Sequence, residues 1–97
     1  PCVAILTYVY DHHRRQLSAR LTDLQHEHHE LTVSTMHAHL DHDHCVEAVI
    51  LRGRAADVRE FAQSVITQPG VSHGQLHLVP MTLHHDHGHP HLVPAAI

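Results

Sequence analysis

A predicted β-hairpin in the middle of the chain constrains the fold most. Apolar and polar side chains alternate over residues 31–40, which is the pattern of a strand with two different faces. Residues 41–44 form a short polar turn, and residues 45–51 form the return strand. Because side chains alternate across a strand, His37 and His39 stand side by side on one face of this hairpin.

The register of the hairpin decides whether Cys45 joins these two histidines. A shift of one residue would move the thiol to the opposite face of the sheet. We expect an odd-length connection that pairs His39 opposite Cys45. We expect the face with Met36 and Ala38 to pack under helices, and the face with His37, His39 and Cys45 to stay uncovered.

The rest of the chain predicts two further strands and two helices. Residues 3–10 are dense in β-branched and aromatic side chains, which is typical of a buried strand. Apolar residues that recur every three or four positions predict helices over residues 13–28 and 55–67. A last strand covers residues 71–79, with a bulge at Gly74. This order predicts an α+β, ferredoxin-like βαββαβ fold, in which a four-stranded antiparallel sheet carries both helices on one face.

His26 lies on the far side of the first predicted helix. At ~100° per residue it falls about 180° from the apolar face, so it points away from its own core. A solvated histidine at a helix end and a ligand offered to a neighbouring subunit both fit this position. We favour the second interpretation, because His37, His39 and Cys45 would then supply three ligands and His26 of another copy the fourth.

Imidazole and thiolate side chains prefer transition ions such as nickel, copper and zinc. A structural zinc site usually has two Cys-x-x-Cys pairs, and the sequence has none. Three nitrogens and one sulfur suit square-planar nickel(II), with copper(II) as a close competitor. His42 and His44 are alternative ligands, ranked lower because turn residues are held less firmly. Four filled positions leave no room for a reactive water, so we expect no enzyme activity.

The composition argues against several other classes of protein. The 97 residues suit one domain, and 6 basic against 10 acidic residues give a net charge of −4 with histidines neutral. A nucleic-acid-binding protein would normally show a basic stripe, so direct DNA binding by this chain alone is not expected. No apolar run approaches the ~20 residues of a membrane span. Cys2 and Cys45 make no disulfide framework, and a thiolate kept for metal indicates a reducing, cytoplasmic location.

Sixteen histidines are the outstanding feature of the composition, and many lie near the end of the chain. From Thr82 the periodic pattern stops, and glycine and proline interrupt the tract that follows. We therefore expect a folded domain over residues 1–81 and a flexible His-rich tail over residues 82–97. Weak, exchangeable metal binding and an inert, solubilising role are both open for the tail histidines, which are His84, His85, His87, His89 and His91.

Several segments resemble one known family, the metal-binding domain of the nickel-responsive repressor NikR. The segments that carry the resemblance include Gln25-His26-Glu27-His28-His29-Glu30-Leu31, Met36-His37-Ala38-His39 and His42-Asp43-His44-Cys45-Val46-Glu47. The similarity covers about Val3 to Pro80. The spacing across His26, His37, His39 and Cys45 fits the nickel ligands of that family.

The resemblance implies an ACT-like fold, a homotetrameric core built as a dimer of dimers, and a square-planar nickel ion that bridges two subunits. His26 would then act in trans, and Tyr10, His12 and Glu47 would form a second layer that orients the ligands. The family also has an additional ion site, partly lined by backbone carbonyls. Those carbonyls would fall at Ile66, Gln68 and Val71.

Two departures from the family leave the function open. The family carries an N-terminal ribbon-helix-helix DNA-binding domain, whereas this chain starts at the first strand of the metal domain, and both a complete chain and a fragment are compatible with Pro1. The added tail resembles those of nickel chaperones and storage proteins. A nickel-sensing regulatory domain and a free-standing storage or chaperone protein, with the tail as a loading arm and a delivery partner, are therefore both open. An ACT-like domain that binds a small organic ligand is a third possibility.

Overall fold

In a computed structural model that describes residues 1–14, 16–86 and 88–96, the chain forms two helices and five strands. In chain order the elements are β1 (Cys2–Asp11), α1 (Leu17–Glu27), β2 (Thr32–His39), β3 (His44–Gly53), α2 (Ala55–Ile66), β4 (Val71–Asp86) and β5 (His89–Pro94).

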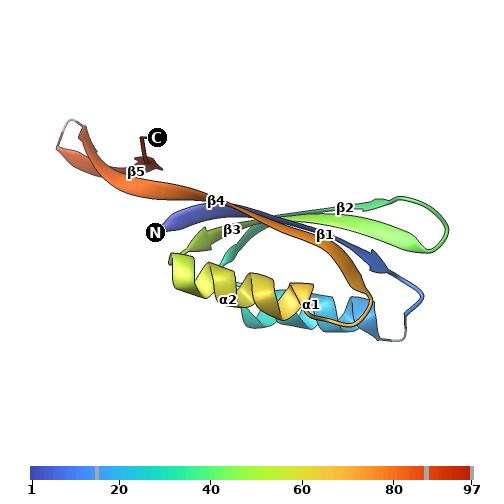
Figure 1. Cartoon of the computed structure of the whole chain (residues 1–97). Helices are drawn as coiled ribbons and strands as arrows, with labels where there is room; N and C mark the ends of the chain where they lie inside the picture. Colours follow the sequence, from blue (N-terminus) through green and yellow to red (C-terminus); the bar gives the residue numbers. More distant parts are fainter. Residues whose placement is uncertain (15, 87, 97) are drawn as a thin grey trace.

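The strands form one sheet in the order β2-β3-β1-β4-β5, and all neighbouring strands are antiparallel. Both helices lie against the same face of this sheet (Figure 1). The predicted α+β, ferredoxin-like fold is therefore confirmed, with one strand more than expected. Over the described ranges, neither helix has the length and apolar character needed to cross a membrane.

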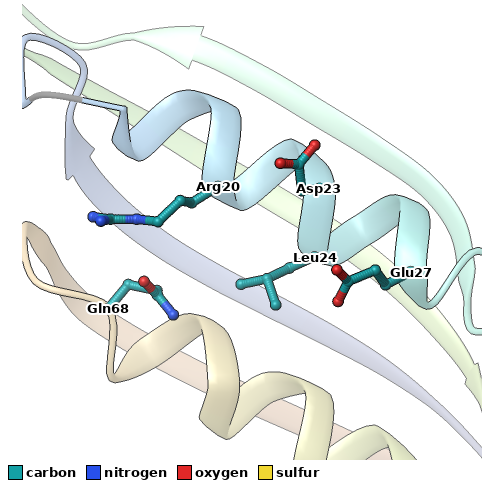
Figure 2. A pocket seen from close by; sticks show the side chains of 5 residues that line it. All are labelled: Arg20, Asp23, Leu24, Glu27 and Gln68. Atoms are coloured by element: carbon teal, nitrogen blue, oxygen red, sulfur yellow. The ribbon is translucent and has the colours of Figure 1, made fainter.

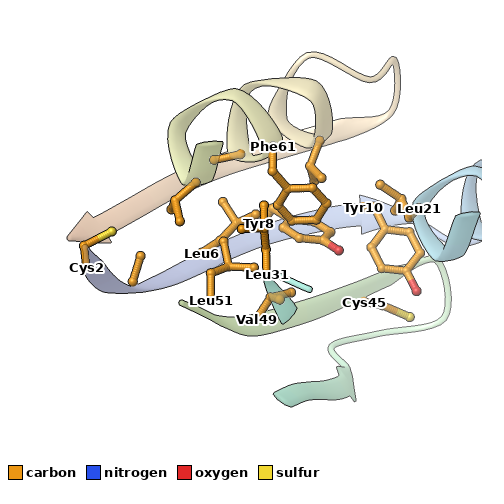
Figure 3. Close-up of a cluster of buried hydrophobic side chains, with 14 of the residues drawn as sticks. Cys2, Leu6, Tyr8, Tyr10, Leu21, Leu31, Cys45, Val49, Leu51 and Phe61 are labelled. Carbon is orange, nitrogen blue, oxygen red and sulfur yellow. The ribbon is translucent and has the colours of Figure 1, made fainter. Parts of the chain in front are cut away.

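The core lies between the sheet and the two helices. Alternate residues of β1, from Cys2 to Tyr10, point toward the helices and are buried. They meet apolar side chains of α1 and α2, among them Leu21 and Phe61 (Figure 3). Because β1 is the central strand of the folded domain, its inward-facing side decides which side of β3 joins the core.

The prediction of which sheet face carries Cys45 was wrong. Cys45 pairs with Tyr10 and Val49 pairs with Leu6, so these β3 residues share the helix-covered face, and Cys45 is only 1% exposed. Met36 lies on the other, uncovered face and is 70% exposed. The reason is that β3 is apolar on both faces, so its own pattern selects neither. The pairing with β1 makes the choice.

The first helix begins later than predicted, at Leu17 rather than near residue 13. The chain first makes a turn, in which the Arg14 N–H donates to the Asp11 carbonyl oxygen at 3.1 Å. Gln16 then has a left-handed backbone with φ 63°, which prevents the helix from extending toward the N-terminus. His12 and His13 are therefore loop residues at the end of β1.

The predicted bulge at Gly74 is confirmed. The register between β1 and β4 shifts between Thr7 and Val9, where β4 carries one extra residue. At this point His73 has a left-handed backbone with φ 55°. A Cβ atom at Gly74 would come 2.6 Å from the side chain of Ile66, so the close approach of α2 requires glycine here.

The expectation that glycine and proline exclude a regular element after Thr82 was wrong. β4 continues to Asp86, and β5 pairs back along it from His89 to Pro94. Gly88, with φ 79°, lies in the short connection, and the β5 prolines are tolerated because β5 is an edge strand. This β4–β5 hairpin projects from the end of the sheet where the N-terminus lies (Figure 1). The domain boundary at residue 81 stays a prediction.

Candidate metal site

The β2–β3 hairpin brings a thiol and an imidazole together as its sequence predicted. His39 pairs opposite Cys45, so the odd register is confirmed. The turn is closed by the Leu40 N–H, which donates to the His44 carbonyl oxygen at 2.9 Å. The Sγ atom of Cys45 lies 3.3 Å from Nδ1 of His39. A buried sulfur and an exposed imidazole therefore face each other at the end of the sheet.

His12 is the third member of this group. One ligand atom each from His12, His39 and Cys45 lies within 4.8 Å of the others. Nε2 of His12 lies 2.7 Å from the carbonyl oxygen of His42, and a carbonyl can only accept. The ring must therefore donate from Nε2, so in a neutral ring it is Nδ1 that offers a lone pair. The resemblance gave His12 an orienting role, and the structure also places it where a ligand could be.

His37 lies beside this group on the same face. Its ring centre is 5.3 Å from that of His39. Nδ1 of His37 is 3.4 Å from the Tyr10 hydroxyl and 3.8 Å from Oε2 of Glu47. Tyr10 and Glu47 thus both approach the ring of His37, which is a predicted ligand. Their role in orienting it stays a prediction.

The polar groups behind His37 are shielded from solvent. Burial and the nearby carboxylate of Glu47 raise the pKa of Tyr10 to about 12, and the same causes raise the pKa of Tyr8. Both phenols are therefore neutral at ordinary pH and keep a proton to donate. Glu47 is itself buried, so its carboxylate needs hydrogen-bond donors from the protein.

Gln25 supplies such a donor, and sequence reasoning missed it. Its side-chain amide donates to Oε1 of Glu47 at 3.1 Å and to the Tyr8 hydroxyl at 3.4 Å. Its own carbonyl oxygen accepts from the Thr35 hydroxyl at 3.1 Å. The available signal was its position four residues after Leu21, which puts a polar side chain on the apolar face of α1.

The structure leaves His26 exposed in the last turn of α1. His28, two residues later, is turned inward instead, with its ring 5.1 Å from that of Phe61 and its Nδ1 2.9 Å from the Leu24 carbonyl oxygen. His26 thus points away from its own core, as expected. It belongs to neither of the ligand groups found among the described residues. Its role as a ligand in trans stays a prediction.

The polar turn between β2 and β3 is held by its own hydrogen bonds. Oδ1 of Asp41 accepts the N–H groups of Asp43 and His44, both at 2.8 Å. These donors hold the pKa of Asp41 below its usual range. Nδ1 of His44 lies 3.0 Å from Oδ1 of Asp41. The ring of His42 instead faces that of His13, with the ring centres 5.2 Å apart. Among the described residues, neither His42 nor His44 joins the group that contains Cys45.

The tail histidines lie on the β4–β5 hairpin, away from this group. His84 pairs with His91, and the alternation of the strand puts His89 on the same face. His85 pairs with Pro90 on the opposite face. All four are exposed, and His87 lies outside the described residues. Three imidazoles thus share one exposed face, although weak metal binding by the tail stays a prediction.

The region of the family's additional ion site lies next to a polar groove between α1 and the end of α2 (Figure 2). The groove has a volume of about 220 Å³ and is lined by Arg20, Asp23, Leu24, Glu27 and Gln68. The carbonyl oxygen of Gln68 accepts the Val71 N–H at 3.1 Å. Ion binding by the carbonyls of Ile66, Gln68 and Val71 stays a prediction.

The uncovered face of the sheet carries an apolar surface. A hollow of about 160 Å³ is lined by Met36, His37, Ala38, Val46 and Ala48. Ile5 of β1 and Ile50 of β3 pair directly across the two strands, and both are exposed nearby. Exposed apolar patches of this kind mark contacts with other molecules.

Comparisons with known proteins agree with the donor chemistry of this site. Residues 3–79 match a family model described as the NikR C terminal nickel binding domain. The chain is 49% identical over 80 residues to the nickel-responsive regulators of Brucella abortus biovar 1 (strain 9-941) and Brucella suis biovar 1 (strain 1330). Each alignment covers 82% of this chain and 61% of the relative, so the chain spans less than two thirds of those proteins.

A solved structure shares the fold at much lower identity. Uncharacterized protein TM1266 from Thermotoga maritima superposes with a TM-score of 0.66 at 16% identity, over 80% of this chain and 94% of that chain. At this level of identity the likeness supports the ferredoxin-like architecture alone.

Proposed function

The chain belongs to the family of NikR C-terminal nickel-binding domains, and from this premise we propose that it is a nickel-sensing regulatory domain whose ion is bound between subunits. The relatives are named as nickel-responsive regulators, which favours a regulatory rather than a catalytic role. We expect no enzyme activity and a cytoplasmic location, where the two free cysteines stay reduced.

The proposed nickel ligands are His37, His39 and Cys45 of one chain and His26 of another. The observation that carries the proposal is the 3.3 Å approach of the Cys45 sulfur to His39 Nδ1, with His37 beside it. The sulfur is buried and the imidazoles are exposed, so the group is open on the solvent side. His26 is exposed on its own chain and can meet such a group on a neighbour.

Self-association is part of this proposal. A ligand given in trans requires a second copy of the chain. The exposed apolar surface around Met36, Ile5 and Ile50 is an area that such a copy can bury. We propose a homotetramer built as a dimer of dimers. Because the ion binds only the assembled form, nickel stabilises one arrangement of the subunits, which could then position attached DNA-binding segments. Direct nucleic-acid or membrane binding by this chain alone is not part of the proposal.

A storage or delivery function is the second candidate. The observation that favours it is the β4–β5 hairpin, which presents His84, His89 and His91 on one exposed face. Such a surface suits weak, exchangeable metal binding and contact with a nickel-delivery partner. A chain with this role would bind nickel without any operator DNA. A nickel-dependent complex with operator DNA would exclude storage as the main role.

Nickel titration followed by absorption tests the proposed ligand set. A nickel–thiolate bond gives a yellow, diamagnetic species, and copper(II) should compete for it in vitro. Replacing Cys45 with alanine should abolish this absorption, and replacing His37 should weaken it strongly. Unchanged stoichiometry and affinity in both variants would leave an ACT-like domain for a small organic ligand as the better interpretation.

Mixing two variants tests the ligand in trans. His26→Ala and Cys45→Ala chains each lack one side of every bridging site, so neither binds nickel tightly alone. If the two chains are unfolded and refolded together, each mixed pair regains one of its two sites, and part of the absorption returns. No recovery, with both variants folded and associated, would reject a ligand shared between chains.

A further inference from the structure

The two faces of the β4–β5 hairpin differ in their chemistry. Its strands pair antiparallel, with Leu83 opposite Leu92 and His84 opposite His91. Successive side chains of a strand point to opposite faces, so the leucine pair lies on one face and the histidine pair on the other. His89, two residues before His91, shares the histidine face, and all three imidazoles are exposed. The register of the hairpin therefore gathers three imidazoles on one side, past the ends of both helices (Figure 1).

The spacing of these three histidines suits one shared ion. Directly opposed residues of an antiparallel pair have Cβ atoms roughly 4.5–5.5 Å apart, and diagonal neighbours are roughly 7–8 Å apart. His84 and His91 have the first relation, and His84 and His89 have the second. Three nitrogens bonded to one ion at about 2.0–2.1 Å lie roughly 3 Å from one another. In the part of the chain that the structure describes, the three rings do not yet converge in this way, and exposed side chains can do so by changing rotamer.

The arrangement of the three side chains selects the geometry of the ion. All three stand on the same face of a two-stranded sheet, so their nitrogens meet an ion from one side, as the legs of a tripod do. Three such ligands occupy three corners of a tetrahedron and leave the fourth corner open to solvent. Square-planar coordination needs its ligands in one plane with the ion, and a tripod does not provide that plane. Three histidines and a water are a donor set that proteins use for tetrahedral zinc(II).

We propose that His84, His89 and His91 form a site for one zinc(II) ion, with water as the fourth ligand. This hairpin site goes beyond the proposed function, because it has no thiolate, needs no second chain and selects a metal other than nickel. It also differs from the exchangeable binding of the storage function, since it holds a single ion in a defined geometry. Its ligands must be neutral, so binding weakens as the pH falls below about 6.5.

An ion at the hairpin site joins the two strands of the hairpin. His84 belongs to β4, whereas His89 and His91 belong to β5. A two-stranded hairpin is marginally stable at best in water, and β5 lies at the edge of the sheet with β4 as its neighbour. The ion binds the paired strands and not the separated ones, so zinc stabilises the hairpin. Protection of the β5 amides from hydrogen exchange therefore reports occupation of the site.

Two single substitutions on the same hairpin test the proposal in the full chain. His91→Asn removes the ligand that lies opposite His84 and two residues from His89. His85→Asn is the matched control, because His85 is also exposed but lies on the opposite face. Cobalt(II) is the probe of geometry, since a tetrahedral cobalt ion absorbs visible light far more strongly than an octahedral one. Both substitutions are made in a Cys45→Ser chain, which removes the thiolate absorption of the other site.

We expect strong tetrahedral cobalt absorption from the Cys45→Ser chain and from its His85→Asn form, and added zinc(II) should displace the cobalt and remove it. The His91→Asn form should lose this absorption. Zinc should slow hydrogen exchange at the amides of β5 in the first two chains and not in the third. Equal cobalt absorption in the two hairpin variants, or octahedral absorption alone in the Cys45→Ser chain, would overturn the proposal.

Zinc counts on chains that keep Cys45 separate this proposal from the proposed function. In equilibrium dialysis His91→Asn should bind one zinc ion fewer per chain than the wild type, and His85→Asn should bind as many. All three chains should keep the nickel–thiolate absorption. Equal zinc counts with intact nickel–thiolate absorption would reject the hairpin site alone. Loss of one zinc ion in His91→Asn, from a wild type without nickel–thiolate absorption, would reject the proposed nickel ligands and leave the hairpin site standing.

Discussion

The hydroxyl of Tyr10 lies 3.4 Å from Nδ1 of His37, so a buried strand residue contacts an exposed imidazole of the proposed nickel site. Glu47 approaches the same nitrogen at 3.8 Å from the neighbouring strand. Such outer partners fix the orientation of a ligand ring, and their loss typically weakens metal binding by roughly 10- to 100-fold.

We therefore expect Tyr10→Phe to weaken nickel binding by about 10-fold or more while the fold is retained. The control is Tyr8→Phe, which removes a phenol that contacts Gln25 rather than a histidine. Competition with a chelator of known affinity gives both dissociation constants, and circular dichroism checks the fold. Equal nickel affinity in the two variants would show that Tyr10 does not orient His37.

The same tyrosines predict how stability depends on alkaline pH. The folded-state pKa of Tyr10 is raised to about 12 and that of Tyr8 is raised as well, both from an ordinary value of 10.0. The folded protein thus holds these protons more tightly than the unfolded chain. Their contribution to stability is complete below pH 10 and is lost as the pH rises toward 12 and above.

Absorbance titration checks this expectation directly. The chain has two tyrosines and no tryptophan, so phenolate absorbance reports Tyr8 and Tyr10 alone. We expect the denatured chain to titrate near pH 10 and the native protein to resist ionisation until the pH is clearly higher. A native phenol that ionises with the denatured midpoint would show that its site is open to solvent.

Gln25→Ala should lower the free energy of unfolding by about 1–3 kcal/mol, because it removes a hydrogen-bond donor from the buried carboxylate of Glu47. The control is Gln63→Ala, a glutamine on the exposed side of α2. Urea denaturation of the metal-free protein measures both. A loss no larger than that of the control would mean that solvent replaces the missing donor.

Removing residues 82–97 tests the domain boundary and the tail together. We expect the truncated chain to keep its thermal unfolding midpoint and its nickel–thiolate absorption, because the core and the proposed ligands precede residue 82. It should lose weakly bound nickel in dialysis at high metal concentration. A large fall in the unfolding midpoint would show that the β4–β5 hairpin is part of the domain.

The sequence could predict the hairpin and its register, because side-chain alternation and turn length are local properties of the chain. The pairing of His39 with Cys45 was expected because the proposed ligand set requires it, and the structure confirms it. The covered face could not be predicted, because β3 is apolar on both sides and its partner β1 decides. The contacts of His12 and Gln25 join distant segments, so the helical spacing could mark Gln25 as a polar residue on an apolar face but could not name its partner.

The His-rich tract illustrates a different limit. Glycine and proline usually interrupt strands, yet an edge strand needs few of its N–H groups and a tight turn accepts Gly88. A rule about residue types therefore failed, because it did not consider the position of the strand in the sheet.

The direction of β4 separates the two histidine-rich ends of the molecule. Cys45 lies opposite Tyr10, whereas β4 leaves the sheet past Cys2, about 27 Å away along β1 at the usual rise of a strand. An ion released by the β4–β5 hairpin therefore cannot step directly to the thiol of its own chain. Transfer between the two would therefore depend on diffusion of the ion through solvent or on the hairpin of another subunit.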